Sequence, residues 1–364
     1  MSQTQSQNGS INEGSGDPLH SFHELTVQDV IRETADATSF VFEVPSALAE
    51  VFHYRPGQFL TFEIPWNEFA IKRCYSLSSA PNSDANPKVT VKRIDDGRMS
   101  NWMNDNISPG DRIRVLPPAG LFVLNPDKSR PCPLTLFAGG SGVTPIMSLL
   151  KQALDETKRQ VTLVYANRDR ESVIFSAELD ELAGRFGDRL TVTHHLDDEA
   201  GFLTQDGVKA QISGRFDSDF YICGPTPFMN TVESALLDSA LEGGSIHIER
   251  FVSAVDPDRQ PTATASAPSG ETLPDNIVIS LEGTTHEIDY QDGETILQAA
   301  VRAGLDVPFS CRDGYCSCCM AKLRAGKVDM TSREALTDKE IEGGWILTCQ
   351  ARPTTEACDV EYEE

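Results

Sequence analysis

Four cysteines near the end of the chain have a spacing that suits iron binding. Cys311, Cys316 and Cys319 form a C-x4-C-x2-C array, and Cys349 follows after 29 intervening residues. Three thiolates in one loop and a fourth from a distant turn are the arrangement that holds a [2Fe–2S] cluster. A disulfide set or a zinc site is the alternative, although zinc sites favour paired C-x2-C arms. The spacing therefore predicts that these four thiolates bind a one-electron carrier, with neighbouring Cys318 as a thiol whose role stays open.

Two short stretches in the first third of the chain carry residue types that suit a flavin nucleotide. In Arg73-Cys74-Tyr75-Ser76, the arginine can pair with phosphate, the tyrosine can face the isoalloxazine ring and the serine can hydrogen-bond the ring near N5. Such a string also occurs in ordinary edge strands. It nevertheless fits the R-x-Y-S signature of ferredoxin reductase-like flavoproteins, and Gly97-Arg98-Met99-Ser100 follows it. In that family the G-x-x-S stretch opens a helix whose amides bind the flavin diphosphate, which implies FAD rather than FMN and adds Gly97, Met99 and Ser100 to the site.

A glycine-rich stretch and a second short motif predict a nicotinamide nucleotide site. Gly139-Gly140-Ser141-Gly142-Val143-Thr144 follows an apolar run and precedes a helical pattern. Glycines permit a sharp turn and let a pyrophosphate approach backbone amides. Cys223-Gly224-Pro225 ends another apolar run and is either the partner motif or a simple turn. In Ala166-Asn167-Arg168-Asp169-Arg170, the acidic residue favours a free ribose 2′-hydroxyl and an arginine can accept a 2′-phosphate, so we expect NADH and leave NADPH open.

Together these motifs resemble, over nearly the whole chain, the FAD- and NAD-dependent ferredoxin reductases that serve bacterial oxygenases. The resemblance implies that Thr144 lies near the nicotinamide and that Cys223 lies beside its hydride-donating carbon. With Ser76 at the flavin, these two residues form the expected catalytic set. Phe251 is expected to cover the flavin as a further cofactor-binding residue.

A plant-type ferredoxin module at the C-terminal end distinguishes groups within this family. The order is similar to that of the phenylacetyl-CoA epoxidase and 3-ketosteroid 9α-hydroxylase reductases. Three stretches are most similar to the ketosteroid group, namely 165–175 (YANRDRESVIF), 247–253 (HIERFVS) and 344–352 (GWILTCQAR). The implied electron path is NADH to FAD to [2Fe–2S] to a terminal Rieske oxygenase in steroid catabolism. A di-iron epoxidase, hydroxylase or desaturase is the nearer alternative, and a redox sensor without turnover is the remote one.

Three kinds of element are needed to position these residues. Short alternating runs with turn residues predict an antiparallel barrel or sandwich, and we assign an FAD-binding β-barrel to 19–127. Alternating apolar strands and helices predict a doubly wound α/β domain for NAD(P), assigned to 128–252. The cysteine array lies in 276–364, for which the resemblance implies an α+β (β-grasp) ferredoxin fold. Residues 1–18 are expected to be a disordered tail and 253–275 a flexible linker.

Charge and cysteine content restrict the classes of partner. The chain has 31 Lys and Arg against 55 Asp and Glu, a net charge of -24, which disfavours nucleic-acid binding and suits docking on a basic protein. Nine cysteines favour a reducing cytoplasm. Glycines interrupt the longest uncharged run, so no membrane span is expected. We expect a monomer whose partner is a terminal oxygenase.

Overall fold

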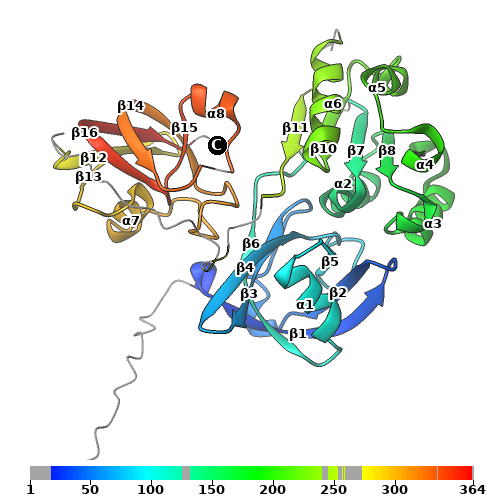
Figure 1. Ribbon diagram of the computed structural model, residues 1–364, viewed down its shortest axis with the longest axis horizontal. Coiled ribbons are helices and arrows are strands. Elements are labelled where there is room, and N and C mark those ends of the chain that lie inside the picture. The colour runs from blue at the N-terminus through cyan, green and yellow to red at the C-terminus, as the bar shows by residue number, and fades with distance from the viewer. Residues whose placement is uncertain are drawn as a thin grey trace, which may run out of the picture.

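The computed structural model describes residues 18–124, 132–239, 245–252, 256, 258, 273–333 and 335–362. These residues form three units of strands and helices, a barrel, a parallel-sheet unit and a ferredoxin unit (Figure 1). Almost all of the predicted tail, and most of the predicted linker, lie outside the described residues. Among the residues described, we find no helix with the length and apolarity that a bilayer span requires.

The first unit is an antiparallel sheet of six strands in the order β4-β3-β6-β1-β2-β5. The strands are β1 (His23–Arg32), β2 (Ala37–Glu43), β3 (Phe59–Trp66), β4 (Phe69–Ser76), β5 (Lys88–Lys92) and β6 (Arg112–Ala119). A bridge between Leu77 and Val89 joins the two edges, so the sheet closes. Helix α1 (Arg98–Asn106) adds Met99 and Met103 to the apolar interior. The predicted barrel is confirmed.

The second unit is a parallel sheet of five strands in the order β11-β10-β7-β8-β9. The strands are β7 (Leu134–Gly139), β8 (Val161–Asn167), β9 (Leu190–Leu196), β10 (Asp219–Cys223) and β11 (Ile246–Glu249). The helices are α2 (Val143–Glu156), α3 (Ser176–Phe186), α4 (Asp197–Ala200), α5 (Gln205–Ile212) and α6 (Thr226–Leu237).

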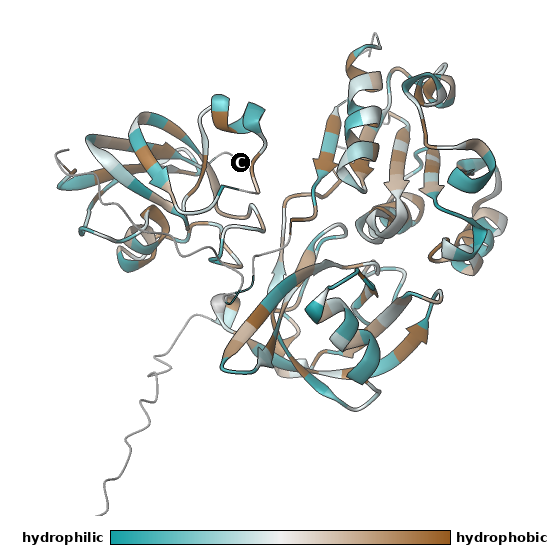
Figure 2. Cartoon of the chain, viewed as in Figure 1, coloured by the Kyte–Doolittle hydropathy of each residue, from teal (hydrophilic) through white to brown (hydrophobic). Residues whose placement is uncertain are grey.

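Helices cover both faces of this parallel sheet. Leu136 of β7 shares a core with α2 and α3, whereas its neighbour Phe137 shares another core with α5 and α6. The strands are therefore apolar on both faces, which Figure 2 shows as largely brown arrows. This is the predicted doubly wound arrangement. Helix α6 begins at Thr226 with Pro227 in its first turn, where a proline is tolerated.

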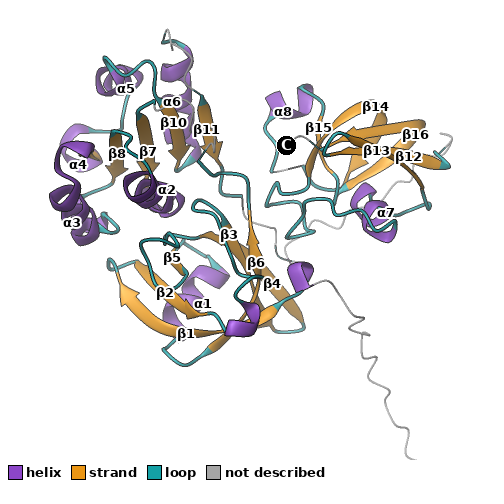
Figure 3. Cartoon of the chain, turned by 180° about the vertical axis from the view of Figure 1, so that it is seen from behind, coloured by secondary structure: helices purple, strands orange, loops and turns teal. Residues whose placement is uncertain are grey.

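The third unit is a mixed sheet in the order β13-β12-β16-β14-β15 with a helix packed on it. The strands are β12 (Asn276–Leu281), β13 (Thr284–Asp289), β14 (Met320–Met330), β15 (Trp345–Leu347) and β16 (Ala351–Glu361). The helices are α7 (Ile296–Arg302) and α8 (Asp338–Glu342). Thr295 caps α7 in a reciprocal capping box with Gln298. The α+β fold expected for the ferredoxin unit is confirmed, and Figure 3 shows this unit beside the barrel from the opposite side.

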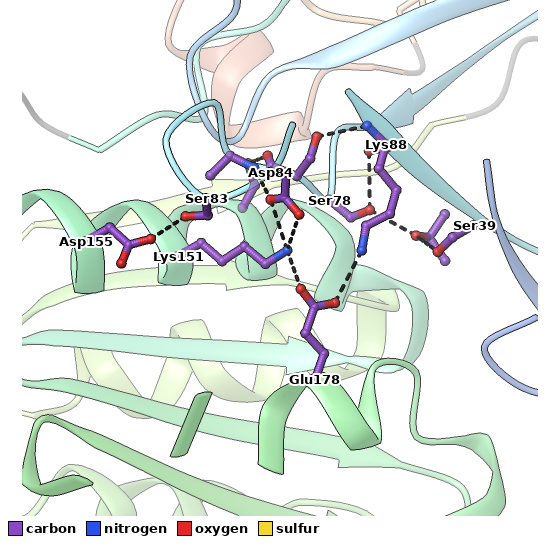
Figure 4. A network of polar contacts seen from close by, with 12 residues as sticks. Ser39, Ser78, Ser83, Asp84, Lys88, Lys151, Asp155 and Glu178 are labelled. Atoms are coloured by element: carbon purple, nitrogen blue, oxygen red, sulfur yellow. Dashed lines mark hydrogen bonds and ion pairs between the residues drawn. The ribbon is translucent and has the colours of Figure 1, made fainter. Parts of the chain in front are cut away.

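A buried ionic network joins the barrel to the parallel-sheet unit (Figure 4). The Lys151 ammonium, whose side chain is 3% exposed, lies 3.1 Å from the Asp84 carboxylate and also pairs with Glu178. Lys88 of β5 lies 3.2 Å from the same Glu178 carboxylate. Each unit supplies one cation and one anion, so the network fixes how the two units meet.

Candidate functional site

A cavity of about 440 Å³ opens where the three units meet. This volume is within the range of roughly 300 to 1,000 Å³ that small-molecule sites occupy. The wall includes many residues that the sequence predicts for flavin or nicotinamide, namely Arg73, Tyr75, Ser76, Gly97, Met99, Ser100, Ser141, Thr144 and Phe251. The fold thus brings the flavin motifs of the barrel to the edge of the glycine-rich turn.

Two arginines in this cavity converge on one buried carboxylate. Arg73 Nη2 lies 2.6 Å from Asp256 Oδ1, and Arg98 Nη1 lies 3.3 Å from Asp256 Oδ2. Arg98 also donates two hydrogen bonds to Asp258, at 2.7 and 2.8 Å. Helix α1 begins directly after Gly97 with no side-chain cap on its first amides. This donor set fits the diphosphate of FAD, because the guanidinium groups already hold an anion beside an uncapped helix start.

The end of strand β4 presents an aromatic ring and a hydroxyl to the cavity. Burial raises the pKa of Tyr75, so its hydroxyl stays protonated at neutral pH. Ser76 is the last residue of the strand and is almost fully buried. Phe251, 49% exposed, supplies a second aromatic ring from the segment after β11. Two aromatic rings and a hydroxyl suit a planar heterocycle such as isoalloxazine.

The glycine-rich turn packs backbone to backbone against the Cys-Gly-Pro motif. A Cβ atom on Gly142 would lie 2.2 Å from the carbonyl oxygen of Cys223. One on Gly139 would lie 2.9 Å from Cδ of Pro225, and one on Gly224 would lie 3.0 Å from the Gly139 backbone. Only glycine permits this approach, so the two predicted nicotinamide motifs form one structure at the ends of β7 and β10.

The same turn contributes Ser141 and Thr144 to the cavity wall, whereas the thiol of Cys223 is buried outside that wall. Gly140 has a φ of 50°, which permits the tight turn before α2. The Thr144 hydroxyl donates to the Ser141 carbonyl at 3.1 Å, and both residues line the cavity. Cys223 is fully buried and is not among the lining residues, and burial raises the pKa of its thiol.

The four predicted ligand thiols lie close together as two pairs. Cys311 is hydrogen-bonded to Cys316, and Cys319 is hydrogen-bonded to Cys349. A [2Fe–2S] cluster needs two thiolates on each of two irons, which two pairs supply. Within the described part of the chain, no three His, Cys, Asp or Glu side chains converge on a single-ion site. The two thiol pairs are the donor set that a [2Fe–2S] cluster uses.

The cysteine loop is docked on the barrel at the cavity. The hydroxyls of Ser310 and Thr61 lie 3.0 Å apart, and Lys72 Nζ lies 3.3 Å from Asp313 Oδ2. Cys316 itself lines the cavity. A predicted cluster ligand thus reaches the same space as the predicted flavin residues.

The cavity wall also contains residues that the sequence does not predict as functional, among them Cys74, Tyr315, Asp256 and Glu249. Cys74 Sγ lies 3.2 Å from Thr61 Oγ1 beside the cysteine loop. Tyr315 is 4% exposed, and its hydroxyl has no hydrogen-bond partner within the described residues. Asp256 and Glu249 supply carboxyl groups. Cys74 lies inside the R-x-Y-S motif, and Tyr315 directly precedes the predicted ligand Cys316. These positions are the sequence features from which their place in the cavity wall could have been predicted.

Glu249 gives the cavity a group that titrates near neutral pH. Burial raises its pKa from 4.5 to about 7, so it is protonated below that pH and ionised above it. A carboxylate there opposes the negative charge that electrons bring, so we expect NADH-dependent flavin reduction to slow by roughly tenfold as the pH rises through 7. Stopped-flow traces of a Glu249→Gln variant should keep the low-pH rate throughout. An equally steep profile in the variant would contradict this assignment.

Three domain families match the chain in the order that the fold shows. Residues 24–124 match the oxidoreductase FAD-binding domain, and residues 136–234 match the oxidoreductase NAD-binding domain. Residues 279–354 match the 2Fe-2S iron-sulfur cluster binding domain. Each match covers one of the three structural units.

Several known proteins are similar over almost the full chain. The ferredoxin reductase component of 3-ketosteroid-9-alpha-monooxygenase from Rhodococcus rhodochrous is 43% identical over 343 residues, covering 93% of this chain and 96% of that protein. One of the subunits of 1,2-phenylacetyl-CoA epoxidase from Escherichia coli (strain K12) is 32% identical over 360 residues, covering 95% of this chain and 99% of that subunit. Among solved structures, phthalate dioxygenase reductase is similar with a TM-score of 0.55 at 27% identity, and the match covers 94% of this chain and 98% of that protein. That structure is described as modular, for electron transfer from pyridine nucleotides to [2Fe–2S].

Proposed function

We propose a function from one premise, that the chain belongs to the ferredoxin reductase-type oxidoreductases with FAD-binding, NAD-binding and 2Fe-2S domains. It is an NAD(P)H-dependent oxidoreductase. We infer that it is the reductase component of a 3-ketosteroid 9α-monooxygenase and passes electrons from NADH through FAD and [2Fe–2S] to a terminal Rieske oxygenase. The shared cavity supports the path, because residues of all three units line it. The 43% identity to a ketosteroid reductase supports the choice of acceptor.

The barrel's residues have the task of binding and orienting the flavin. Arg73, Arg98 and the first amides of α1 would hold its diphosphate, and Tyr75 and Phe251 would contact its ring. Gly97 leaves room for the Ser100 hydroxyl at this helix start, since a Cβ there would lie 2.5 Å from Oγ of Ser100. Ser76, Met99 and Ser100 line the same cavity wall, and we propose that they also contact the flavin nucleotide.

The parallel-sheet unit has the task of presenting the nicotinamide to that ring. The paired glycine motifs would hold the pyrophosphate, and Thr144 at the cavity wall would lie against the nicotinamide. When bound, FAD accepts two electrons as hydride and releases them singly to a [2Fe–2S] cluster held by the four thiolates. Cys223, which the resemblance places beside the hydride-donating carbon, is fully buried and outside the cavity wall, so we propose that it positions the turn against the nicotinamide instead of touching it.

The choice of NADH rests on Arg168 and Asp169. Arg168 Nε donates to the Asp169 carboxylate at 2.8 Å, which lowers the pKa of that carboxyl and keeps it ionised. A carboxylate disfavours a 2′-phosphate, and Arg168 is already paired with that carboxylate. Reduction of the flavin by NADPH and not by NADH would overturn this choice.

A di-iron acceptor is the second candidate function. The observation that favours it is the 32% identity to the phenylacetyl-CoA epoxidase subunit. The higher identity to the ketosteroid reductases makes a Rieske oxygenase our first choice. We further propose that the chain is a cytoplasmic monomer, with an FAD domain at 19–127, an NAD domain at 128–252 and a ferredoxin domain at 276–364.

An anaerobic titration of the purified protein with NADH tests the proposed path. We expect the flavin absorbance to bleach and a rhombic EPR signal of a reduced [2Fe–2S] cluster to appear. Bleaching without an EPR signal, in protein with a full complement of iron and sulfide, would contradict the path. Bleaching with NADPH alone would overturn the nucleotide choice. Stopped-flow mixing with purified ketosteroid oxygenase then tests the acceptor.

Phe251 offers a separate test of the flavin site. If its ring covers the isoalloxazine, a Phe251→Ala variant should open the nicotinamide-binding face and change the KM for NADH by roughly tenfold, about 1.4 kcal/mol. Exposed Phe202, on the parallel-sheet unit and not in the cavity wall, provides a matched Phe202→Ala control. Unchanged nicotinamide kinetics in the Phe251 variant would count against the covering role.

A further inference from the structure

The ferredoxin unit carries a second cavity, of about 290 Å³, beside its cysteine loop. Helix α7 contributes Leu297, Val301 and Arg302 to its wall, and the loop contributes Arg312, so we call it the α7 groove. The wall also includes Cys349, a predicted cluster ligand. Among the described residues, none lines both the α7 groove and the flavin cavity.

The two thiol pairs are divided between the two cavities. Cys316, hydrogen-bonded to Cys311, lines the flavin cavity, whereas Cys349, hydrogen-bonded to Cys319, lines the α7 groove. A cluster held by these thiols would therefore have one ligand at each opening. Electrons could enter on one side and leave on the other.

Docking on the barrel leaves the α7 groove open. The contacts Lys72–Asp313 and Thr61–Ser310 hold the loop against strands β3 and β4. With these contacts made, Val301 is still 42% exposed. A partner protein can therefore reach the groove in the docked arrangement, whereas the barrel covers the side at Cys316.

The groove has a chemistry that a protein partner can match. Val301 is an exposed apolar side chain at its rim. Arg302 is already neutralised, at 2.9 Å from Asp289 and 2.7 Å from Glu294. Arg312 stacks on a phenylalanine ring at 4.6 Å and is exposed, and no carboxylate of the described residues lies within ion-pair distance. The fitting partner surface presents an apolar side chain next to one carboxylate that faces Arg312, within a surface that is otherwise basic and matches the chain's net charge of -24.

We infer that the α7 groove is the docking site of the terminal oxygenase, and that electrons leave past Cys349 while the ferredoxin unit stays docked on the barrel. The identity of this partner rests on the proposed function. Each NADH gives up a hydride and becomes NAD⁺, and that hydride supplies two electrons and one proton, of which the proton is released to solvent. Two successive one-electron transfers through the cluster to the oxygenase account for both electrons. The ferredoxin unit does not have to move between the two transfers.

Locking the docked arrangement tests this inference. A Lys72→Cys/Asp313→Cys variant, joined by a short bismaleimide, ties the loop to the barrel at a contact that already exists. NADH reduction of the cluster is followed by EPR, and reduction of purified ketosteroid oxygenase is followed by stopped-flow absorbance. We expect the locked protein to reduce the oxygenase within about twofold of the same variant left unlinked.

Each other outcome has a distinct meaning. A locked protein that reduces its cluster but not the oxygenase would overturn the inference and leave the proposed path intact. A locked protein whose cluster is no longer reduced would also overturn it, because the docked arrangement would not be the one that receives electrons. Failure of the unlinked variant and the unsubstituted protein to reduce the cluster would instead contradict the proposed function.

A substitution within the groove provides a second, independent measurement. Val301→Glu adds a charge at the exposed rim without removing a buried side chain, and we expect it to weaken the calorimetric Kd for the oxygenase at least tenfold. Ala357→Glu adds the same charge at an exposed position of β16 outside the groove and should leave Kd within about twofold. The cluster EPR signal reports that both variants are folded. An unchanged Kd for Val301→Glu, or equal weakening by the control, would overturn the docking site.

Discussion

A Cys319→Ser variant should lose the iron–sulfur cluster, whereas a Cys318→Ser variant should keep it. Cys319 is hydrogen-bonded to Cys349 and completes the second thiol pair. Cys318 is hydrogen-bonded to Cys316 and its thiol is near Cys74, on the flavin side of the loop. Cys318 belongs to neither thiol pair, so its replacement should leave all four predicted ligand thiolates to bind the two irons.

The measurement is iron and sulfide content together with the EPR signal of the reduced protein. For Cys319→Ser, reduction of the oxygenase should fall on the order of 100-fold or more, because no one-electron carrier remains. Ferricyanide takes electrons from flavin directly, so NADH-dependent ferricyanide reduction should persist in both variants. Cluster loss in Cys318→Ser with retention in Cys319→Ser would exchange the two roles.

The predicted parts of the site are those whose residues are close in the chain. The cysteine spacing is local, and the loop needs little more than its own sequence to gather three thiols. Gly97 and Gly142 could likewise be recognised because each marks a close approach that excludes a Cβ. By contrast, Lys72 and Asp313 are 241 residues apart and meet only when two units dock. No local pattern contains that contact, so the sequence does not predict that Cys74 and Tyr315 lie at the junction.

The predicted strands show a similar division. β7 and β10 are buried on both faces, so their continuous apolar runs were readily recognised. The long strands β14 and β16 were missed. β14 is largely exposed, and two register shifts in their pairing interrupt the alternation that identifies a strand. Their register depends on each other and on β12, which is information that the chain acquires only on folding.

Replacing Lys151 with methionine should destabilise the protein by about 2–3 kcal/mol, below the roughly 3–5 kcal/mol of a fully buried pair, because the carboxylates that lose their shared cation are only partly buried. Lys151 is the cation that Asp84 and Glu178 share across the interface between the barrel and the parallel-sheet unit (Figure 4). Lys209→Met is the matched control, since the Lys209–Asp238 pair is exposed and should contribute about 1 kcal/mol or less. Urea unfolding at neutral pH measures both. Equal effects of the two substitutions would show that the buried network has no special role.

The pH dependence of that difference tests whether the charge of Lys151, paired with Glu178, is what stabilises the protein. Burial acts to raise the pKa of Glu178, but the Lys151 and Lys88 ammonium groups together outweigh it, so the pKa lies below its usual 4.5. A lowered pKa in the folded state stabilises the protein above pH 4.5, and this contribution is lost as the pH falls through the folded value. We therefore expect the gap between wild type and Lys151→Met to shrink on acidification below about pH 4.5. A gap that stays constant would assign the stabilisation to packing of the lysine side chain instead of its charge.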